Sequence, residues 1–465
     1  MTDDHKVYAI RWLVLTCLVG LMLAGTVQFF AFAPVANVVD QFYCRGACPA
    51  ANLAGSIFAF ATAVALLAAI WVADTHGIRT SMLLASPLLV VGGLLKVASA
   101  LPSTPESAAI LLLLLGQLVN GCGYGSVLCL ASKVAGLWFP PHQRATAVAI
   151  AMLGSPLGLM VGTFVPSLLV ERGGHILYMT IALACPSLFF GALTIACVRT
   201  GVPPTPPSAS AGGEWLDFWP GFKRAVKTPH YLLLCAFVGN LIGPVMASFV
   251  LLQQILCPQG YSNSFVGLNG IVSIGCGLLS TPFLAAFLDK TKLYADSVKV
   301  IAALTSVSGI AYITASQYAG LEWLLLALTG CLGAGQMAVL PAVLELAVEA
   351  TYPAPQAIVQ GLIMVVMQLS TTAYSALLPL LAWEQPNPPA RQSCTGAFSR
   401  DVHAKDWSAV VTVTQTAYAL NAVAVMLLLS TREKRVAAER RHRLQGRLRE
   451  QDTGTGLVDM AGVAG

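Results

Sequence analysis

Apolar runs of about 18 or more residues, each long enough to cross the roughly 30 Å hydrocarbon layer of a bilayer as a helix, recur along the whole chain. Charged residues make up only 10% of the sequence and hydrophobic residues 56%, whereas soluble domains carry about a quarter charged residues. The pattern therefore predicts an all-α membrane protein. We expect twelve transmembrane helices, at about 12–39, 52–73, 81–101, 108–134, 145–169, 175–198, 230–257, 264–288, 296–317, 321–348, 357–382 and 407–430.

The positive charges predict which way the chain is oriented in the membrane. Most of the 26 lysines and arginines lie in segments that share one side with both ends of the chain, and such segments are normally cytoplasmic. We therefore expect both termini in the cytoplasm. Separately from the charges, we expect the plasma membrane rather than an endomembrane. The basic run 432–449 follows the last span, where it either contacts anionic lipid or serves only as a topology anchor. The net charge gives no reason to expect nucleic-acid binding.

A Pro-, Gly- and Ser-rich stretch separates the twelve spans into six and six. It contains VPPTPPSASAGG, a composition typical of a linker. The basic, aromatic segment that follows it predicts an interfacial helix. We predict an N-terminal half at 1–198, a cytoplasmic linker at 199–229, a C-terminal half at 230–430 and a basic cytoplasmic tail at 431–465, in a chain that acts as a monomer.

Two loops recur at nearly the same offset, which supports this division. Asp74 follows the second span and Asp289 follows the eighth, 215 positions later, while FPPHQ at 139–143 and YPAPQ at 352–356 lie 213 positions apart. Two six-helix halves related by an axis along the membrane normal describe the major facilitator superfamily, in which the substrate site lies between the halves. The sequence resembles that superfamily.

The loop ADTHGIRTS at 73–81 resembles the superfamily's signature between its second and third spans. Gly77 would permit the tight turn, and Asp74 and Arg79 could form a charge-assisted latch against the other half. Asp289 would belong to a weaker copy of the signature. The alternative is that these are ordinary topology charges.

Two further acidic residues lie near the same cytoplasmic loops. Glu345 and Glu349 are one helical turn apart, and we expect them to pair with Arg79 or Arg144 at an inner gate. No acidic residue lies near the middle of a predicted span, which favours a facilitative carrier over proton coupling. Lys96 lies late in the third span, and we expect its amine to extend outward to the membrane surface.

Several stretches resemble one family of solute carriers more specifically. LWFPPHQRATA at 137–147, LLQQILC at 251–257 and ELAVEATYP at 345–353 resemble the feline leukaemia virus subgroup C receptor-related family, which includes transporters proposed for haem and choline. FAPVANV at 32–38 is most similar to that family's poorly characterised third-member branch. The resemblance implies a multi-pass transporter that works by alternating access.

The resemblance also implies a central cavity. Choline-carrying relatives use a tryptophan directly after a glutamine on helix 1, a tyrosine on helix 7 and a glutamine on helix 11. In this sequence Phe29 follows Gln28, Met246 takes the tyrosine position and Gln368 the helix 11 glutamine. Phenylalanine offers a cation a weaker π face than tryptophan does. We expect the cavity to be lined by Gln28, Phe29, Phe32, Met246, Gln253 and Gln368, with Asn37 packed near its outer end.

These observations predict a secondary-active or facilitative carrier of a small organic solute such as a choline-like amine. The alternatives are a haem or porphyrin transporter, which would lack a histidine ligand inside any span, and a non-transporting receptor or sensor on a carrier fold. The sequence has no catalytic constellation or metal-ligand cluster, so we expect neither an enzyme nor a cofactor.

Eight of the 12 cysteines lie inside spans. The other four, which would face outside and leave one disulfide possible, are Cys44, Cys48, Cys257 and Cys394.

Overall fold

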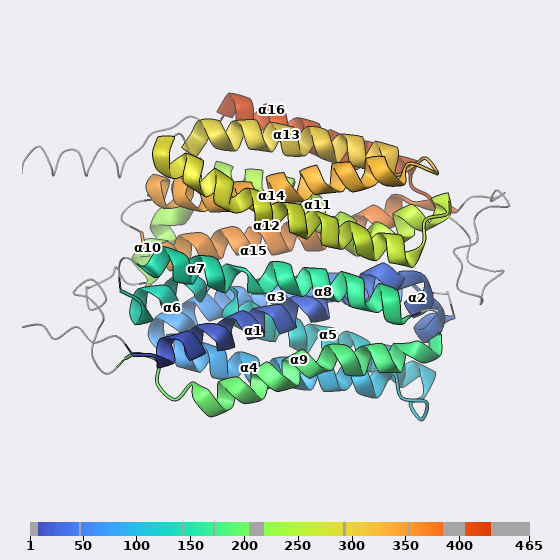
Figure 1. The fold of residues 1–465 in the computed structure, drawn as a ribbon, viewed down its shortest axis with the longest axis horizontal. Helices are drawn as coiled ribbons and strands as arrows, with labels where there is room; N and C mark the ends of the chain where they lie inside the picture. Colours follow the sequence, from blue (N-terminus) through green and yellow to red (C-terminus); the bar gives the residue numbers. More distant parts are fainter. Residues whose placement is uncertain are drawn as a thin grey trace, which may run out of the picture.

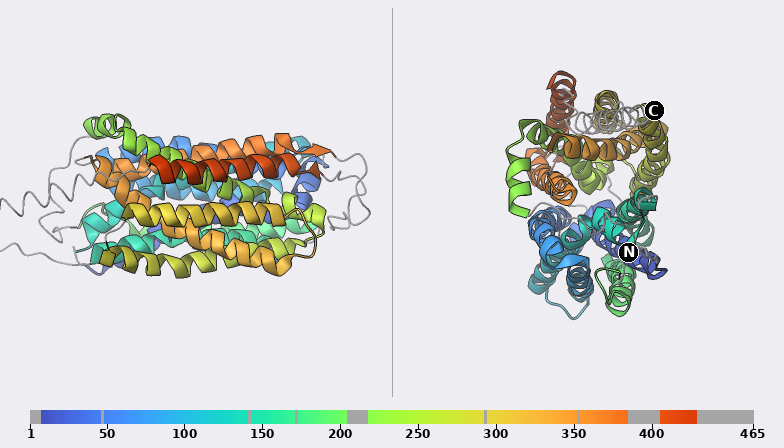
Figure 2. Two further views of the ribbon diagram at one scale, coloured as in Figure 1. Left: turned by 90° about the horizontal axis from the view of Figure 1, so that it is seen from above. Right: turned by 90° about the vertical axis from the view of Figure 1, so that its left-hand side faces the viewer.

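The fold is a bundle of long helices whose ends form two opposite faces (Figure 1). The computed structural model describes residues 8–45, 48–140, 143–170, 173–203, 218–291, 294–351, 354–384 and 405–428. Twelve helical segments are long and apolar enough to cross a membrane. We call the end of the bundle where the first helix begins the terminal face and the opposite end the distal face. Seen from the terminal face, the helices coloured blue to green lie on one side of the bundle and those coloured yellow to red on the other (Figure 2).

The helices confirm the predicted fold class of two six-helix halves. The elements of the N-terminal half are α1 (Ile10–Phe30), η1 (Ala33–Val35), α2 (Ala36–Cys44), α3 (Ala50–Thr75), α4 (Gly77–Ser99), α5 (Glu106–Leu128), α6 (Ala131–Trp138), α7 (Arg144–Met152), α8 (Gly154–Leu169), η3 (Gly173–His175) and α9 (Ile176–Cys197). Those that follow are α10 (Phe218–Val226), α11 (Pro229–Leu256), η5 (Cys257–Gln259), α12 (Asn263–Thr291), α13 (Tyr294–Ala315), α14 (Glu322–Thr351), α15 (Gln356–Leu377), η6 (Leu378–Leu381), β1 (Trp383–Glu384), β2 (Lys405–Asp406) and α16 (Ser408–Leu428).

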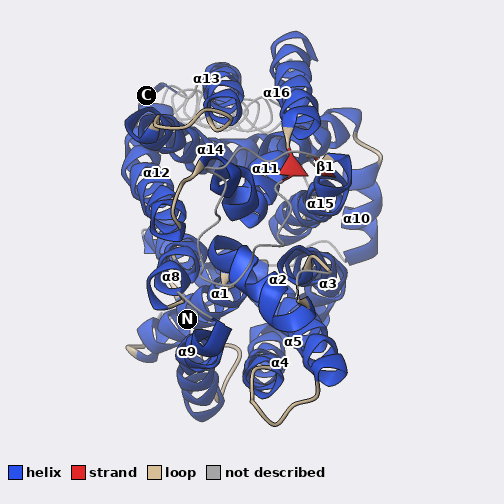
Figure 3. Ribbon diagram, turned by 90° about the vertical axis from the view of Figure 1, so that its right-hand side faces the viewer, coloured by secondary structure: helices blue, strands red, loops and turns tan. Residues whose placement is uncertain are grey.

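Helices of one half pack mainly on one another. In the N-terminal half, α4 packs on α5 and α9, and α1 packs on α8 and α9. In the C-terminal half, α14 packs on α12 and α13, and α16 packs on α13. From the distal face the two groups lie on opposite sides of the molecule (Figure 3). Short α10 carries Trp219, which is 62% exposed, and it lies against α11 and α15.

The first span is broken in the middle rather than continuous. Helix α1 ends at Phe30, a turn follows at residues 31–32, and Pro34 lies within the short η1 before α2 begins. Proline cannot donate a backbone hydrogen bond and clashes with the preceding turn of a helix, which explains the break. The predicted first span, at about 12–39, lies within the single membrane-spanning segment Ile10–Cys44.

The two halves contact each other along two seams. On one side α3 packs against α15, and on the other α8 packs against α12. The α8/α12 seam is tight because small residues face each other: a Cβ added to Gly270 would lie 2.3 Å from the Thr163 hydroxyl oxygen. Toward the terminal face, the α3/α15 seam is apolar and includes Leu66, Ile70 and Ile358.

Polar contacts cross between the halves near the distal face. The amides of Asn52 on α3 and Gln254 on α11 bond reciprocally, at 3.0 and 2.9 Å. One turn further along α3, the hydroxyls of Ser56 and Ser375 are 3.0 Å apart. Asn263 on α12 donates to the amide oxygen of Asn37 on α2 at 3.4 Å. The distal side is thus closed by neutral hydrogen bonds between the halves.

Candidate functional site

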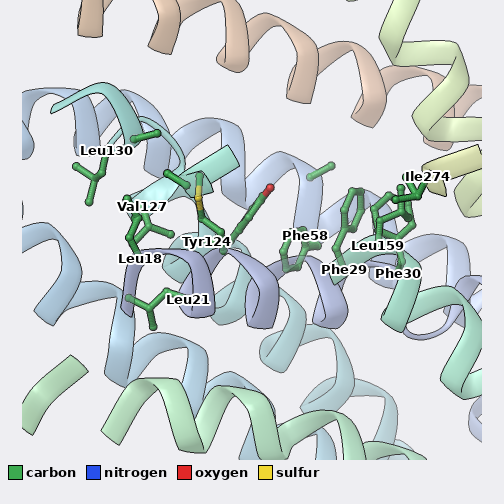
Figure 4. Packing of buried hydrophobic residues seen from close by; sticks show 14 of the residues in the cluster. Leu18, Leu21, Phe29, Phe30, Phe58, Tyr124, Val127, Leu130, Leu159 and Ile274 are labelled. Carbon is green, nitrogen blue, oxygen red and sulfur yellow. The ribbon is translucent and has the colours of Figure 1, made fainter. Parts of the chain in front are cut away.

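A row of three aromatic side chains lies where the N-terminal half meets the C-terminal half. Phe29 on α1 stacks on Phe58 on α3, with ring centroids 4.7 Å apart and planes 7° apart. Phe58 in turn lies 5.8 Å from the Tyr124 ring on α5. Figure 4 shows the three side chains in sequence along the interior of the bundle. We call Phe29, Phe58 and Tyr124 the aromatic row.

The aromatic row belongs to a buried cluster that includes residues of both halves. Phe249 and Val250 of α11 are members of the same cluster, and Met246 packs against it from the same helix. At the end of the row, the hydroxyl groups of Tyr124 and Ser155 on α8 lie 2.9 Å apart. The structure therefore places two of the predicted cavity residues, Phe29 and Met246, in the region between the halves.

Two other predicted cavity residues point away from the second half. The Gln28 side-chain amide donates to the Leu183 carbonyl oxygen on α9 at 2.7 Å and lies 3.4 Å from the Ser187 hydroxyl. Phe32 is buried in a cluster of N-terminal residues. Our expectation that Gln28 and Phe32 line the central cavity is corrected by this geometry: successive helical residues point about 100° apart, so Phe29 and Gln28 face different neighbours.

Lys96 is the largest departure from expectation, because it is buried rather than extended to the membrane surface. Its side chain is 2% exposed. The amine donates to the Gln117 amide oxygen at 3.2 Å and to the Gln28 carbonyl at 3.4 Å, and it lies 5.6 Å from the centre of the Phe32 ring. Helical side chains lean toward the helix N-terminus, which for α4 is at the terminal face, so the amine reaches into the bundle. We call Lys96, Gln28, Gln117 and Phe32 the Lys96 cluster.

The remaining predicted cavity residues lie apart from one another. Gln253 is buried near the distal face, and its amide lies 3.5 Å from the Asn263 amide oxygen. Gln368 is half-buried on α15, and its side chain makes no hydrogen bond with any described residue. Its backbone carbonyl accepts the Thr372 hydroxyl at 2.8 Å. The structure thus leaves the Gln368 amide available for another partner.

The predicted gate residues are arranged differently from expectation. Gly77 has a φ of 80°, the left-handed conformation for which glycine is suited, and the α3–α4 turn needs it. Asp74 pairs with Lys133 on α6, at 3.2 Å, within the same half. This ion pair of Asp74 is not the latch against the other half that we expected of Asp74 and Arg79, and Arg79 is exposed. Lys133 also donates to the Ala73 carbonyl.

The other predicted gate residues are Arg144, Glu345, Glu349 and Asp289. The Nε of Arg144 donates to the Phe139 carbonyl at 3.2 Å. Glu345 is exposed and belongs to none of the described ion pairs. The side chains of Glu349 and Asp289 lie outside the described part of the chain. The expected pairing of Glu345 with Arg79 or Arg144 is therefore not present in this conformation.

The C-terminal half contains a small cleft between α11, α13, α14 and α16. It is lined by Val245, Ser248, Phe249, Leu252, Gly309, Tyr312, Ile313, Thr329, Leu332 and Tyr418. Its polar groups are hydroxyls: Tyr312 donates to the Asn269 amide oxygen at 3.2 Å, and Ser248 donates to the Pro244 carbonyl. No charged side chain lines this cleft.

Several residues of the site were not predicted from sequence. Phe58 and Tyr124 lie in apolar or glycine-rich stretches that read as ordinary helix packing. The Asn52–Gln254 pair could have been suspected only from two amides in spans, since their partnership joins positions about 200 residues apart.

Among the outer cysteines, Cys44 and Cys48 form a disulfide and Cys257 is also disulfide-bonded, whereas Cys394 lies outside the described residues.

Twelve spans in two packed groups are the architecture of a membrane carrier of the facilitator type. Solved structures agree on the fold: a D-xylose–proton symporter has a TM-score of 0.64 at 14% identity, covering 92% of this chain and 99% of that one. A bacterial homologue of the lysosomal transporter Spinster has a TM-score of 0.61 at 12% identity, covering 91% and 95%.

The family model described as Major Facilitator Superfamily matches residues 14–375, and the solute carrier family 49 member A3 of Danio rerio is 31% identical over 93% of this chain and 90% of its own length. The chain belongs to the Major Facilitator Superfamily and, within it, to solute carrier family 49, as the resemblance predicted. The choline/ethanolamine transporter FLVCR1 of Felis catus is 27% identical over 77% of this chain and 65% of its own length. The chain is therefore a transporter with a facilitator fold.

Proposed function

We propose that this carrier moves a small, weakly polar organic solute of the choline-like amine class along the interface between its two halves. The observation that carries the proposal is the aromatic row, whose π faces attract organic cations and whose cluster extends into the second half. Relatives named as choline/ethanolamine transporters support the same class. Phe29 provides a weaker π face than tryptophan would, which favours a less strongly cationic solute than choline itself.

The proposed path contacts three of the predicted residues. Phe29 and Met246 contribute apolar surface from opposite halves, and Gln368 contributes an amide without a described partner. An amide that is half-buried in a membrane protein generally gains from a hydrogen-bond partner. Gln253 lies nearer the distal face and would meet the solute only when that face opens.

We infer that the gates work through neutral contacts more than through charge. Distal opening would break the Asn52–Gln254 pair, and terminal opening would separate Ile70 from Ile358. Asp74, Gly77 and Arg79 would then set the geometry of the terminal-face loop through Lys133. Arg144, Asp289, Glu345 and Glu349 are candidates for ion pairs at the terminal-face gate.

We propose that the terminal face is cytoplasmic, that the protein acts as a monomer in the plasma membrane, and that linker and tail lie on that side. Exposed Trp219 and Lys223 on α10 are typical of a helix at the membrane interface. The basic tail at 431–465, outside the described residues, would contact anionic lipid.

Uptake of a labelled metabolite panel into proteoliposomes tests the function. The panel contains choline, ethanolamine, other small amines, neutral metabolites and haem. We expect a small amine to accumulate above empty liposomes. We further expect Gln368→Ala to lower uptake of that solute by about threefold or more, the effect of losing about one intramembrane hydrogen bond, at unchanged expression. The matched control is Gln415→Ala, a half-buried glutamine on α16 that bonds to Thr314.

Accumulation of haem alone would replace the amine with the porphyrin alternative. If no solute accumulates although the protein is correctly inserted, the receptor or sensor alternative replaces the carrier. Unchanged uptake by the Gln368→Ala variant would remove Gln368 from the path.

A further inference from the structure

The Lys96 cluster holds a buried positive side chain without a carboxylate partner. Lys96 is 2% exposed and takes part in none of the ion pairs among the described residues. Its partners are the Gln117 amide oxygen, the Gln28 carbonyl and the Phe32 ring. An ionisable side chain inside a membrane span is costly and usually has a function, and the solute path described above does not use this one.

The cluster converges on one peptide group of α1. The Gln28 carbonyl accepts from Lys96 at 3.4 Å and from the Gln117 amide at 3.2 Å. The Gln28 side chain donates in addition to the Leu183 carbonyl at 2.7 Å. Helices α4, α5 and α9 therefore all bond to the same residue of α1, immediately before that helix breaks.

The location suits a cation physically. Gln28 lies in the last turn of α1, which ends at Phe30. Carbonyl groups in a last turn lack their normal backbone partners, and the C-terminal end of a helix carries a partial negative charge that favours a nearby cation. The Phe32 ring adds a π face to the same amine. Lys96, a residue of α4, thus supplies a hydrogen-bond donor to the C-terminal end of α1.

The residue after this anchor is the first ring of the aromatic row. Phe29 stacks on Phe58 at 4.7 Å, in the cluster shared with the second half. We propose that Lys96 is a positioning residue: by holding the Gln28 carbonyl it fixes where α1 ends, and it thereby presents Phe29 to the solute path. This inference rests on the proposed path, and it assigns Gln28 an anchoring role in place of solute contact.

The second half indicates that the fold itself does not require such a lysine. At the offset of 213–215 between the repeated loops, position 96 corresponds to Gly309, Ile310 and Ala311 on α13. Gly309 lines the C-terminal cleft, which has no charged side chain. Equivalent helices therefore pack in the C-terminal half without a cation, so the lysine serves something specific to the N-terminal half.

A double-mutant cycle on solute uptake tests the role. Lys96→Met removes the donors at similar size, and Phe29→Leu removes the ring. Each change is expected to raise KM by about threefold to tenfold, the effect of one or two interhelical hydrogen bonds, with a smaller change in kcat. Because Lys96 acts through Phe29, the double variant should resemble the more affected single variant. Lys223→Met, an exposed lysine on α10, is the matched control.

Independent effects that multiply in the double variant, or an unchanged KM in Lys96→Met, would overturn the inference. Lys96→Gln, which keeps an N–H donor, should show a KM between those of the wild type and Lys96→Met. If both Lys96 variants fail to insert, the lysine is only a folding requirement and the positioning role is rejected.

A labelling experiment separates this inference from the proposed function. Phe29→Cys is introduced alone and together with Lys96→Met, and its reaction with a methanethiosulfonate amine is followed by mass spectrometry of that peptide. We expect labelling to be at least about threefold faster without Lys96, and no faster with Lys223→Met. An unchanged rate overturns the inference whatever the solute. A faster rate in a protein that carries no solute overturns the transport path and supports the link from Lys96 to Phe29.

Discussion

The interiors of the two halves differ although their helices correspond. In the N-terminal half, the space between α1, α4, α5 and α9 is filled by Lys96, Gln28 and Gln117, joined by hydrogen bonds. In the C-terminal half, the corresponding space between α11, α13, α14 and α16 contains a small cleft with hydroxyl and apolar walls. A pseudo-symmetric scaffold thus accommodates a polar, anchored interior in one half and an uncharged one in the other.

This difference parallels a difference in the helices that begin each half. Helix α1 stops at Phe30, whereas α11 continues from Pro229 to Leu256 through Pro244. A broken helix has carbonyl groups that need donors, and the Lys96 cluster supplies them. The continuous helix α11 has no such need. We conclude that the lysine accompanies the break in α1 and does not belong to the general architecture.

The largest expected effect comes from placing a lysine in the interior of the C-terminal half, compared with removing Lys96 from the N-terminal half. Ile313 is 3% exposed and lines the C-terminal cleft, whose lining residues include no charged side chain. Ile313→Lys should destabilise the protein by about 1–3 kcal/mol, where the upper value is the cost of a charge at the centre of a membrane helix and Ile313 lies in the last turn of α13. Lys96→Met should cost less, since apolar replacement of a buried charge is often nearly neutral. Thermal unfolding in detergent measures both.

Equal loss of stability in the two variants would contradict the comparison, because it would mean that both interiors tolerate charge to the same degree. The matched control is Ile313→Met, which keeps the cleft apolar and should leave the unfolding temperature nearly unchanged.

A smaller effect is expected from crowding the Lys96 cluster. A Cβ on Gly116 would lie 2.8 Å from the Lys96 Cγ and 2.9 Å from the Gly92 carbonyl oxygen. Gly116→Ala should therefore destabilise the protein by about 1–2 kcal/mol, the typical cost of overpacking. Gly275→Ala on α12 is the control, because nothing lies within 4 Å of its added Cβ. The same unfolding measurement compares the two, and equal stability would argue against close packing around Lys96.

The fold was predictable because length and hydropathy determine it. Apolar runs of membrane-spanning length leave few alternatives to helices, and the repeated loops indicated two halves. The left-handed turn at Gly77 was predictable from its place in the D-x-x-G-x-R motif. The break after Phe30 was indicated by Pro34, although its consequences for side-chain direction were not.

The site was only partly predictable, because the direction of a polar side chain depends on its neighbours. Gln28 and Phe29 are adjacent in sequence, yet the Gln28 amide bonds to α9 while the Phe29 ring stacks on Phe58 of α3. The inward direction of the Lys96 amine depends on its hydrogen bonds to Gln117 and to the Gln28 carbonyl, which are 21 and 68 positions away in the sequence. Asp74 pairs with Lys133 of its own half and not with the other half, since a loop charge pairs with a partner that the fold brings near.

The central claim is that solute passes between the two halves, so reversible closure of the distal seam tests it most directly. Cysteines replace Asn52 and Gln254, whose amides bond across the halves, and a short bifunctional thiol reagent with a reducible link joins them in proteoliposomes. We predict that crosslinking stops uptake, that reduction restores it, and that either single-cysteine variant is unaffected by the reagent. Uptake that continues at the uncrosslinked rate would contradict passage between the halves.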